Sequence, residues 1–185
     1  DGLAVESGFH RARGDLLPAL EGRRIDQIAV THEHEDHVGN AAVIAKRFGA
    51  AVRGPAATRH IIERPHSLIR FPYHYVLWGV GPGVPVEPLG DVVETPRYRL
   101  EVIPTPGHTR DHVAFFEPRR RLVFTGDLYT GPKVRAARKV ENVADQIASL
   151  ERVRDLKPAR MICYHKGPIE DPIPALEAKI AFMRG

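Results

Sequence analysis

The sequence predicts an α/β fold in which mixed sheets are covered by helices. Apolar runs typical of strands alternate along the chain with segments whose apolar residues recur at helical spacing. Two of the runs, Val113–Glu117 and Arg121–Thr125, are joined by the turn-like Pro118-Arg119-Arg120, which indicates an antiparallel hairpin. The 185 residues are 43% hydrophobic and 27% charged, ordinary values for a globular chain with a real core. We expect a single domain over residues 1–185.

The first half of the chain is predicted to open with two strands. Leu3–Val5 has the composition of a short strand, and Ile25–Val30 of a longer one. Apolar residues then recur at helical spacing, at Val38, Ala41, Ala42, Ala45 and Phe48. Gly49 suits the C-terminal cap of that helix, and Asp36 stands where its N-cap would be.

A less regular region follows two short elements. Ala51–Arg53 is predicted to be a strand and Ala56–Glu63 a helix. Residues 64–97 are rich in proline, glycine and aromatic residues, which favours loops with short helices. Tyr73 and Trp78 lie in this region, either packing it down or lining a substrate pocket.

Regular elements return in the second half. Tyr98–Ile103 is predicted to be a strand, followed by the hairpin. Val143, Ile147, Leu150 and Val153 form one face of a helix that Pro158 ends. Arg160–Cys163 is predicted to be a strand and Pro174–Met183 the final helix.

Four predicted strands lead into side chains that can bind a metal. Ile25–Val30 leads to the cluster His32–His37, Tyr98–Ile103 to His108, Arg121–Thr125 to Asp127, and Arg160–Cys163 to His165. Side chains alternate in an extended chain, so His32 and His34 point the same way and can reach one metal, whereas Asp36 and His37 can face a neighbouring point. Imidazole and carboxylate ligands suit zinc, iron or manganese better than calcium. The alternative is that His32–His37 form a solvated polar loop that binds no metal.

The order His32-x-His34-x-Asp36-His37, Gly107-His108, Gly126-Asp127 and His165 resembles the metallo-β-lactamase superfamily of binuclear hydrolases. The resemblance covers nearly the whole chain. It implies an α/β fold of the αββα type, a four-layer sandwich of two mixed sheets flanked by helices, with the site along one edge of the sheets.

The resemblance also implies a ligand set for two divalent metal ions, with zinc preferred and iron or manganese as alternatives. In that set His32, His34 and His108 bind the first metal, and Asp36, His37 and His165 bind the second. Asp127 bridges both. Asp36 and Asp127 are also the expected catalytic residues, because they would position a metal-bridging hydroxide.

The chain departs from the family pattern near its start. The family usually has Asp-x-Gly after its early strand, and here Glu6-Ser7-Gly8 occupies that place. The family fold normally has another strand before this one, so we expect the domain to lack its first strand.

Three further residues follow the ligand motifs. His112 comes four positions after His108 and is expected to orient a ligand through a hydrogen bond. Tyr129, two residues after Asp127, resembles a tyrosine that contacts the substrate carbonyl in lactonases of the family. Lys133 begins a basic run with Arg135, Arg138 and Lys139, which is either solvated or placed to meet an anionic substrate.

The predicted activity is hydrolysis of a carboxylic ester or thioester, in the manner of a lactonase or thioesterase. The alternatives are a phosphodiesterase or nuclease, a β-lactamase, and a mononuclear-iron persulfide dioxygenase. Only 37 residues separate Asp127 from His165, which leaves no room for the inserted domain of the long nucleic-acid-processing members.

Net charge and cysteine content bear on the cellular location and the partners of the protein. A net charge of +4 permits attraction to anions without indicating nucleic-acid binding. The single cysteine, Cys163, excludes an internal disulfide and fits a reducing compartment, and no export signal or membrane span is visible. We expect a cytoplasmic enzyme with a small-molecule substrate, no membrane partner and no nucleic-acid partner.

Overall fold

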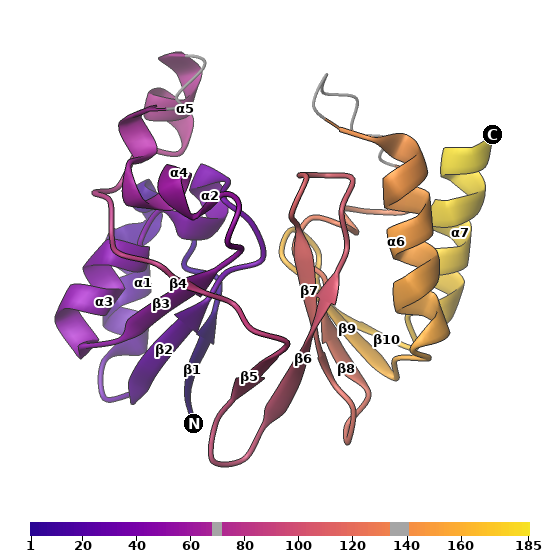
Figure 1. Cartoon of the computed structure of the whole chain (residues 1–185), viewed down its shortest axis with the longest axis horizontal. Coiled ribbons are helices and arrows are strands. Elements are labelled where there is room, and N and C mark those ends of the chain that lie inside the picture. The colour runs from indigo at the N-terminus through magenta and orange to yellow at the C-terminus, as the bar shows by residue number, and fades with distance from the viewer. Residues whose placement is uncertain (68–71, 134–140) are drawn as a thin grey trace. The chain divides into compact units, whose positions relative to one another are not determined.

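The computed structural model describes residues 1–67, 72–133 and 141–185, which form two compact units (Figure 1). The first unit comprises residues 1–89 and 95–97, and the second comprises residues 90–94 and 98–185. Each unit contains one sheet and one hydrophobic core. The prediction of a single domain over residues 1–185 stays a prediction.

The first unit holds a four-stranded sheet in the order β1-β2-β3-β4, parallel in all its described pairings. Its strands are β1 (Gly2–Val5), β2 (Ile25–Ala29), β3 (Ala51–Gly54) and β4 (Glu87–Pro88). Its helices are η1 (His10–Ala12), α1 (Arg13–Leu20), α2 (Glu35–Val38), α3 (Ala41–Phe48), α4 (Arg59–Glu63), η2 (Pro65–Ser67) and α5 (Pro72–Leu77). α3 packs on β2 and β3, and Ile28, Ile44 and Val52 are buried in this core. The centre of this sheet therefore rests on a helix, which fixes the end of β2 that leads to the histidines.

The predicted helix over Val38–Phe48 is divided in two, and Asp36 is not its N-cap. α2 begins at Glu35 after the extended His34, so Asp36 lies in the first turn, where a carboxylate suits the helix dipole. α3 starts afresh after Asn40 and ends at Gly49, whose φ of 70° gives the predicted left-handed cap. The short α2, which contains His37, turns the chain immediately after His34.

The second unit holds a six-stranded mixed sheet in the order β10-β9-β8-β7-β6-β5. Its strands are β5 (Val92–Glu94), β6 (Arg99–Pro104), β7 (Val113–Glu117), β8 (Leu122–Phe124), β9 (Arg160–Cys163) and β10 (Gly167–Glu170). β7 and β8 form the predicted antiparallel hairpin, and β8 pairs with β9 in parallel. Helices α6 (Val143–Asp155) and α7 (Ile173–Arg184) cover this sheet, burying Leu150, Val153, Leu176 and Ile180 in its core.

Several elements differ from the sequence prediction. We expected both sheets to be mixed, but only the second is. The sequence pattern did not indicate α1, which has Pro18 inside it and no buried residue. It also missed β10, a strand with half-exposed and exposed residues that pairs antiparallel with β9. Both elements lack the apolar periodicity on which the prediction rested.

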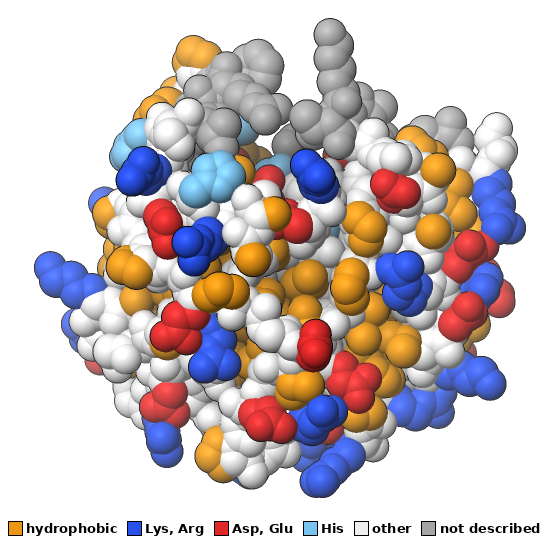
Figure 2. All heavy atoms as spheres, in the orientation of Figure 1, with side chains coloured by type: hydrophobic (Ala, Val, Ile, Leu, Met, Phe, Trp, Pro, Cys, Tyr) orange, Lys and Arg blue, Asp and Glu red, His pale blue; other side chains and the backbone are white. Residues whose placement is uncertain are grey.

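Surface charges of the two signs are interspersed on the face drawn in Figure 2. Arg24 lies 2.7 Å from Asp26, and Arg160 lies 2.7 Å from Glu170, both as exposed pairs. Across the parts of the chain that the structure describes, no helix has the length and apolar character needed to cross a membrane.

Candidate metal centre

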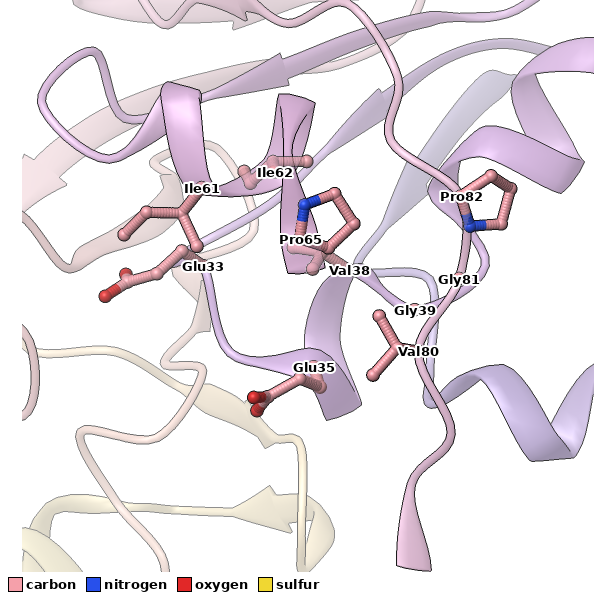
Figure 3. A pocket seen from close by; sticks show the side chains of 10 residues that line it. All are labelled: Glu33, Glu35, Val38, Gly39, Ile61, Ile62, Pro65, Val80, Gly81 and Pro82. Atoms are coloured by element: carbon pink, nitrogen blue, oxygen red, sulfur yellow. The ribbon is translucent and has the colours of Figure 1, made fainter. Parts of the chain in front are cut away.

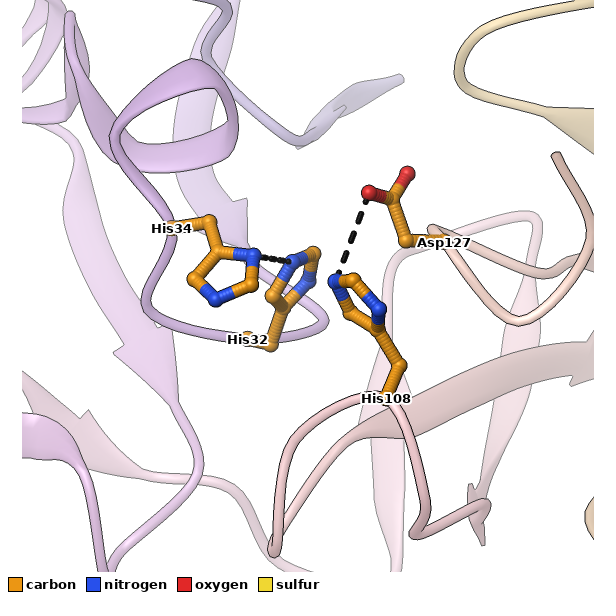
Figure 4. A group of neighbouring side chains, drawn as sticks. All are labelled: His32, His34, His108 and Asp127. Atoms are coloured by element: carbon orange, nitrogen blue, oxygen red, sulfur yellow. Dashed lines mark hydrogen bonds and ion pairs between the residues drawn. The ribbon is translucent and has the colours of Figure 1, made fainter. Parts of the chain in front are cut away.

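Three histidines gather just beyond the end of β2 in the first unit. His32 and His37 are completely buried, and their ring centroids lie 4.1 Å apart. His32 Nε2 lies 3.0 Å from His34 Nδ1, as the predicted same-side placement requires (Figure 4). Two imidazole nitrogens that face each other in this way can share a proton or bind one cation. Asp36 is close by, with Oδ2 3.7 Å from His37 Nε2.

Oxygen atoms hold the other ring nitrogens of the two buried histidines. Thr31 Oγ1 lies 2.9 Å from His32 Nδ1, and Glu6 Oε1 lies 3.2 Å from His37 Nδ1. Glu6 also accepts hydrogen bonds from the Thr31 hydroxyl and, at 3.3 Å, from the Thr31 backbone N–H. Such partners orient an imidazole and fix which nitrogen carries the proton.

Glu6 reaches this position through an unusual backbone conformation. Its φ is 67°, in the left-handed region that non-glycine residues seldom adopt. Its backbone N–H donates to Ala29 O at 2.9 Å, and Ser7 N donates to His37 O at 2.8 Å. The residue that replaces the family's usual aspartate is thus built into the support of His37, and its strain is of the kind found at functional sites.

A pocket in the first unit is lined by residues of the segment that carries the histidines (Figure 3). Glu33 and Glu35, which alternate with the histidines, line it together with apolar residues that include Val38, Ile62 and Pro65. Glu35 Oε1 lies 2.6 Å from His74 Nδ1 of α5. Glu33 and Glu35 thus line this pocket, and Glu35 is in addition paired with a histidine of α5.

In the second unit, Asp127 stands between two histidines. Its Oδ2 lies 3.5 Å from His108 Nε2, the contact drawn in Figure 4, and its Oδ1 lies 3.1 Å from His165 Nε2. The side chain of Asp127 is 9% exposed and that of His165 is 37% exposed. The two carboxylate oxygens therefore face different histidines, which is the geometry that a bridging carboxylate needs.

His112 is completely buried and holds the backbone of Asp127. The Asp127 backbone N–H donates to His112 Nε2 at 3.3 Å, so Nδ1 carries the ring proton and donates to Thr105 Oγ1 at 2.8 Å. The histidine that we predicted to orient a ligand is thus hydrogen-bonded to the proposed bridging residue.

The residues that we predicted to contact the substrate differ in their burial. Tyr129 is 3% exposed within the second core, and burial raises its pKa. Trp78 packs edge-on against Phe9 with ring centroids 5.7 Å apart, and Lys133 is exposed. Tyr73 belongs to α5, with its side chain outside the description, and residues 134–140, including Arg135, Arg138 and Lys139, lie outside the described residues. The substrate roles of these residues stay predictions.

Cys163 is a buried apolar residue, as the sequence indicated. It is 1% exposed, and its Sγ contacts Tyr129 O. Burial raises the pKa of its thiol, which keeps the group neutral and unreactive at ordinary pH.

Sequence reasoning missed Glu141. Its side chain is 1% exposed and places Oε1 3.1 Å from His108 Nδ1. Glu141 lies 33 positions after His108 in a region without a motif, so no local pattern could have indicated the contact.

The donor set of both units suits a divalent transition metal. It consists of imidazole nitrogens and carboxylate oxygens that are largely buried, and several of the imidazoles have their second nitrogen held by an oxygen partner. Within the first unit alone, ligand atoms of Glu6, His32 and His37 lie within 4.8 Å of one another. A cluster of hydrated surface charges would be exposed to water and would not need oxygen partners to orient its imidazole rings.

Comparison with known proteins gives the family. The sequence model of the metallo-beta-lactamase superfamily matches residues 5–165. The chain therefore belongs to the metallo-β-lactamase superfamily.

Among curated relatives, a hydroxyacylglutathione hydrolase from Cereibacter sphaeroides is 33% identical over 154 residues, which are 81% of this chain and 52% of the relative. A beta-lactamase-like protein 2 homolog from Drosophila melanogaster is 31% identical over 170 residues, which are 89% of this chain and 52% of that protein. The chain spans about half the length of these curated relatives.

Solved structures share the fold. An archaeal metallo-beta-lactamase superfamily protein from Sulfolobus tokodaii matches with a TM-score of 0.80 at 20% identity, covering 99% of this chain and 76% of that one. TTHA1623 in a di-iron-bound form matches with a TM-score of 0.71 at 26% identity, covering 91% and 84%. The predicted fold class is confirmed, with two sheets that are each accompanied by helices.

Proposed function

We propose that this chain is a metal-dependent hydrolase that cleaves an acyl thioester or a related carboxylic ester and holds two divalent metal ions. The proposed ligands are His32, His34 and His108 for the first metal, Asp36, His37 and His165 for the second, and Asp127 for both. The family supports the class of reaction, and the relatives named hydroxyacylglutathione hydrolase support a thioester, because the acyl group in such a substrate is joined to the glutathione sulfur.

The placement of Asp127 is the observation that carries the proposal. Its Oδ2 faces His108, assigned to the first metal, and its Oδ1 faces His165, assigned to the second. A carboxylate that bound a single metal would have no need to present its oxygens to two different histidines. The di-iron form of TTHA1623 supports a two-metal centre and makes iron the principal alternative to zinc.

The chain's own residues would hold and orient the reacting groups. Bound divalent cations supply Lewis acidity and lower the pKa of water. Asp36 and Asp127 would offset the positive charge of the bound metals and would position the attacking water. His112 fixes Asp127 through its backbone N–H, so the carboxylate stays aimed while charge develops on the substrate. No serine or cysteine nucleophile is needed, and Cys163 is buried away from such a role.

We also propose a substrate class and a cellular location for the enzyme. The substrate is a small molecule, and the interspersed surface charges offer little support for a nucleic-acid partner. A cytoplasmic location is supported by Cys163, a lone buried cysteine.

A hydrolysis panel on metal-loaded protein tests the function. Acyl thioesters, lactones, simple esters, β-lactams and phosphodiesters are compared side by side, and we expect thioesters to give the highest kcat/KM. Asp127→Ala should lower kcat far more than it raises KM, because the carboxylate acts chiefly in the transition state. Asp155→Ala, which removes an exposed carboxylate of the same unit, is the control.

Two outcomes would refute the proposal. Preferred cleavage of phosphodiesters would replace the thioester assignment. Near-normal turnover of Asp127→Ala with full metal content would show that Gly126-Asp127 is only a turn.

A further inference from the structure

One face of α6 is hydrogen-bonded to the segment that leads to His108. Gln146 Nε2 donates to Gly107 O at 3.2 Å, Ser149 Oγ donates to Pro106 O at 2.7 Å, and Arg152 donates to Pro104 O. The backbone N–H of Asn142, the N-cap of α6, donates to Gly107 O at 2.8 Å. The helix and its N-cap thus bond the carbonyls of Pro104, Pro106 and Gly107, and the segment has little freedom to move relative to α6.

Gly107 makes this close approach possible. Its φ is 129°, and a Cβ built on it would lie 2.4 Å from the backbone nitrogen of Gln146. Any other residue would have to push the helix away from the loop. The contact brings Glu141, the residue before the N-cap of α6, next to His108, the residue after the glycine.

The two ring nitrogens of His108 face different carboxylates, Nδ1 facing Glu141 and Nε2 facing Asp127. Glu141 Oε1 lies 3.1 Å from His108 Nδ1, whereas Nε2 of the same ring faces Asp127 Oδ2 at 3.5 Å. The carboxylate is 1% exposed, so it is largely removed from water. A buried carboxylate is costly unless it accepts hydrogen bonds or faces a positive charge.

A buried lysine also interacts electrostatically with this carboxylate. Lys179 of α7 is 2% exposed, and Glu141 is the largest influence that favours its charged form. Burial nevertheless lowers the pKa of Lys179 overall. Gln146 Nε2 also approaches Glu141 Oε2 at 3.5 Å. Glu141 thus has Gln146 of α6 near one carboxylate oxygen and His108 near the other.

We propose that Glu141 is a positioning residue, whose carboxylate faces His108 Nδ1, accepts a hydrogen bond from its N–H when the metal is bound, and so directs His108 Nε2 to the first metal. This inference rests on the proposed function, because it assigns His108 as a ligand. The carboxylate fixes one tautomer and one ring orientation and makes the imidazole a stronger donor to a cation. An ordinary ion pair that served only to hold α6 in place would stabilise the fold without affecting metal affinity.

Metal affinity of Glu141 variants tests the inference directly. Glu141→Ala should weaken binding of the first metal by about 10–100-fold in competition with a chromophoric zinc chelator. Glu141→Gln keeps an oxygen acceptor without the charge, so its loss should be smaller. Glu151→Ala is the matched control, because Glu151 lies on the same helix but pairs with Arg184, and its affinity should equal that of the wild type.

The melting temperature of the metal-free variants separates positioning from folding. We expect Glu141→Gln to melt close to Glu151→Ala. A lowered melting temperature with wild-type metal affinity in both Glu141 variants would overturn the inference, because Glu141 would then be a structural group only.

A double-mutant cycle with His108→Ala is a second test of the positioning role of Glu141. Glu141→Ala should cause no further loss of metal affinity once His108 is absent, because it acts through that ring. Equal losses in both backgrounds would overturn the positioning role. Wild-type protein that binds no metal would instead refute the proposed function, so the two failures are distinguishable.

Discussion

Replacement of His112 tests how the chain aims its proposed bridging carboxylate. His112 is not one of the proposed metal ligands, but its Nε2 accepts a hydrogen bond from the backbone N–H of Asp127 at 3.3 Å. Its Nδ1 donates to Thr105 Oγ1 at 2.8 Å, and the ring is completely buried. Removing the ring should therefore free the turn that presents Asp127 without deleting any proposed ligand.

The expected loss of metal affinity follows from the backbone N–H of Asp127, which loses its acceptor once the His112 ring is removed. A buried N–H that loses its acceptor costs about 1–3 kcal/mol. If the metal-bound state bears this cost because it needs Asp127 fixed, metal affinity falls by about 5–150-fold, at 1.4 kcal/mol for each factor of ten. This range overlaps the factor of about 10–100 that outer-sphere substitutions typically cost.

Two replacements of His112 separate its two hydrogen bonds. Glutamine can place an amide oxygen near the position of Nε2 and keep the bond to Asp127, whereas asparagine can place an amide nitrogen near Nδ1 and keep the bond to Thr105. We expect His112→Gln to retain most of the metal affinity and His112→Asn to lose about 10–100-fold. The assay is chelator competition, with kcat and KM measured on the best substrate of the panel.

Equal losses in the two variants would refute the reasoning, because the bond to Asp127 would then have no special role. Wild-type affinity in both variants would show that His112 only fills space in the core.

Two further predictions concern metal content and the support of His37. Protein purified without chelator should contain two metals per chain by elemental analysis, and chelation should lower its melting temperature, because metal that binds only the folded state stabilises it. A stoichiometry that never exceeds one, or a melting temperature that chelation leaves unchanged, would contradict this. Glu6→Ala should lower the unfolding free energy of the metal-free protein by about 1–3 kcal/mol in denaturant titration, because it removes the acceptor of the Thr31 donors from a buried site. The exposed carboxylate Glu21 gives the control, Glu21→Ala, and equal effects of the two changes would contradict the assigned support.

The sequence by itself determined which residues end the strands and what chemistry they carry. The alternation of side chains placed His32 and His34 on one side, and their nitrogens lie 3.0 Å apart. The hairpin of β7 and β8 followed from its turn, and the left-handed end of α3 followed from Gly49. These features depend on residues a few positions apart, whose geometry is set by local backbone sterics and periodicity.

The tertiary structure decided which groups hold those ligands in place. Glu6 reaches Thr31 and His37 only because its backbone turns to a φ of 67° beside β2, and Glu141 reaches His108 only because Gly107 lets α6 approach the loop. Packing also placed Tyr129 in the core of the second unit, which its sequence position did not indicate. Contacts between residues 25 or more positions apart depend on how whole elements pack, and no local pattern encodes that.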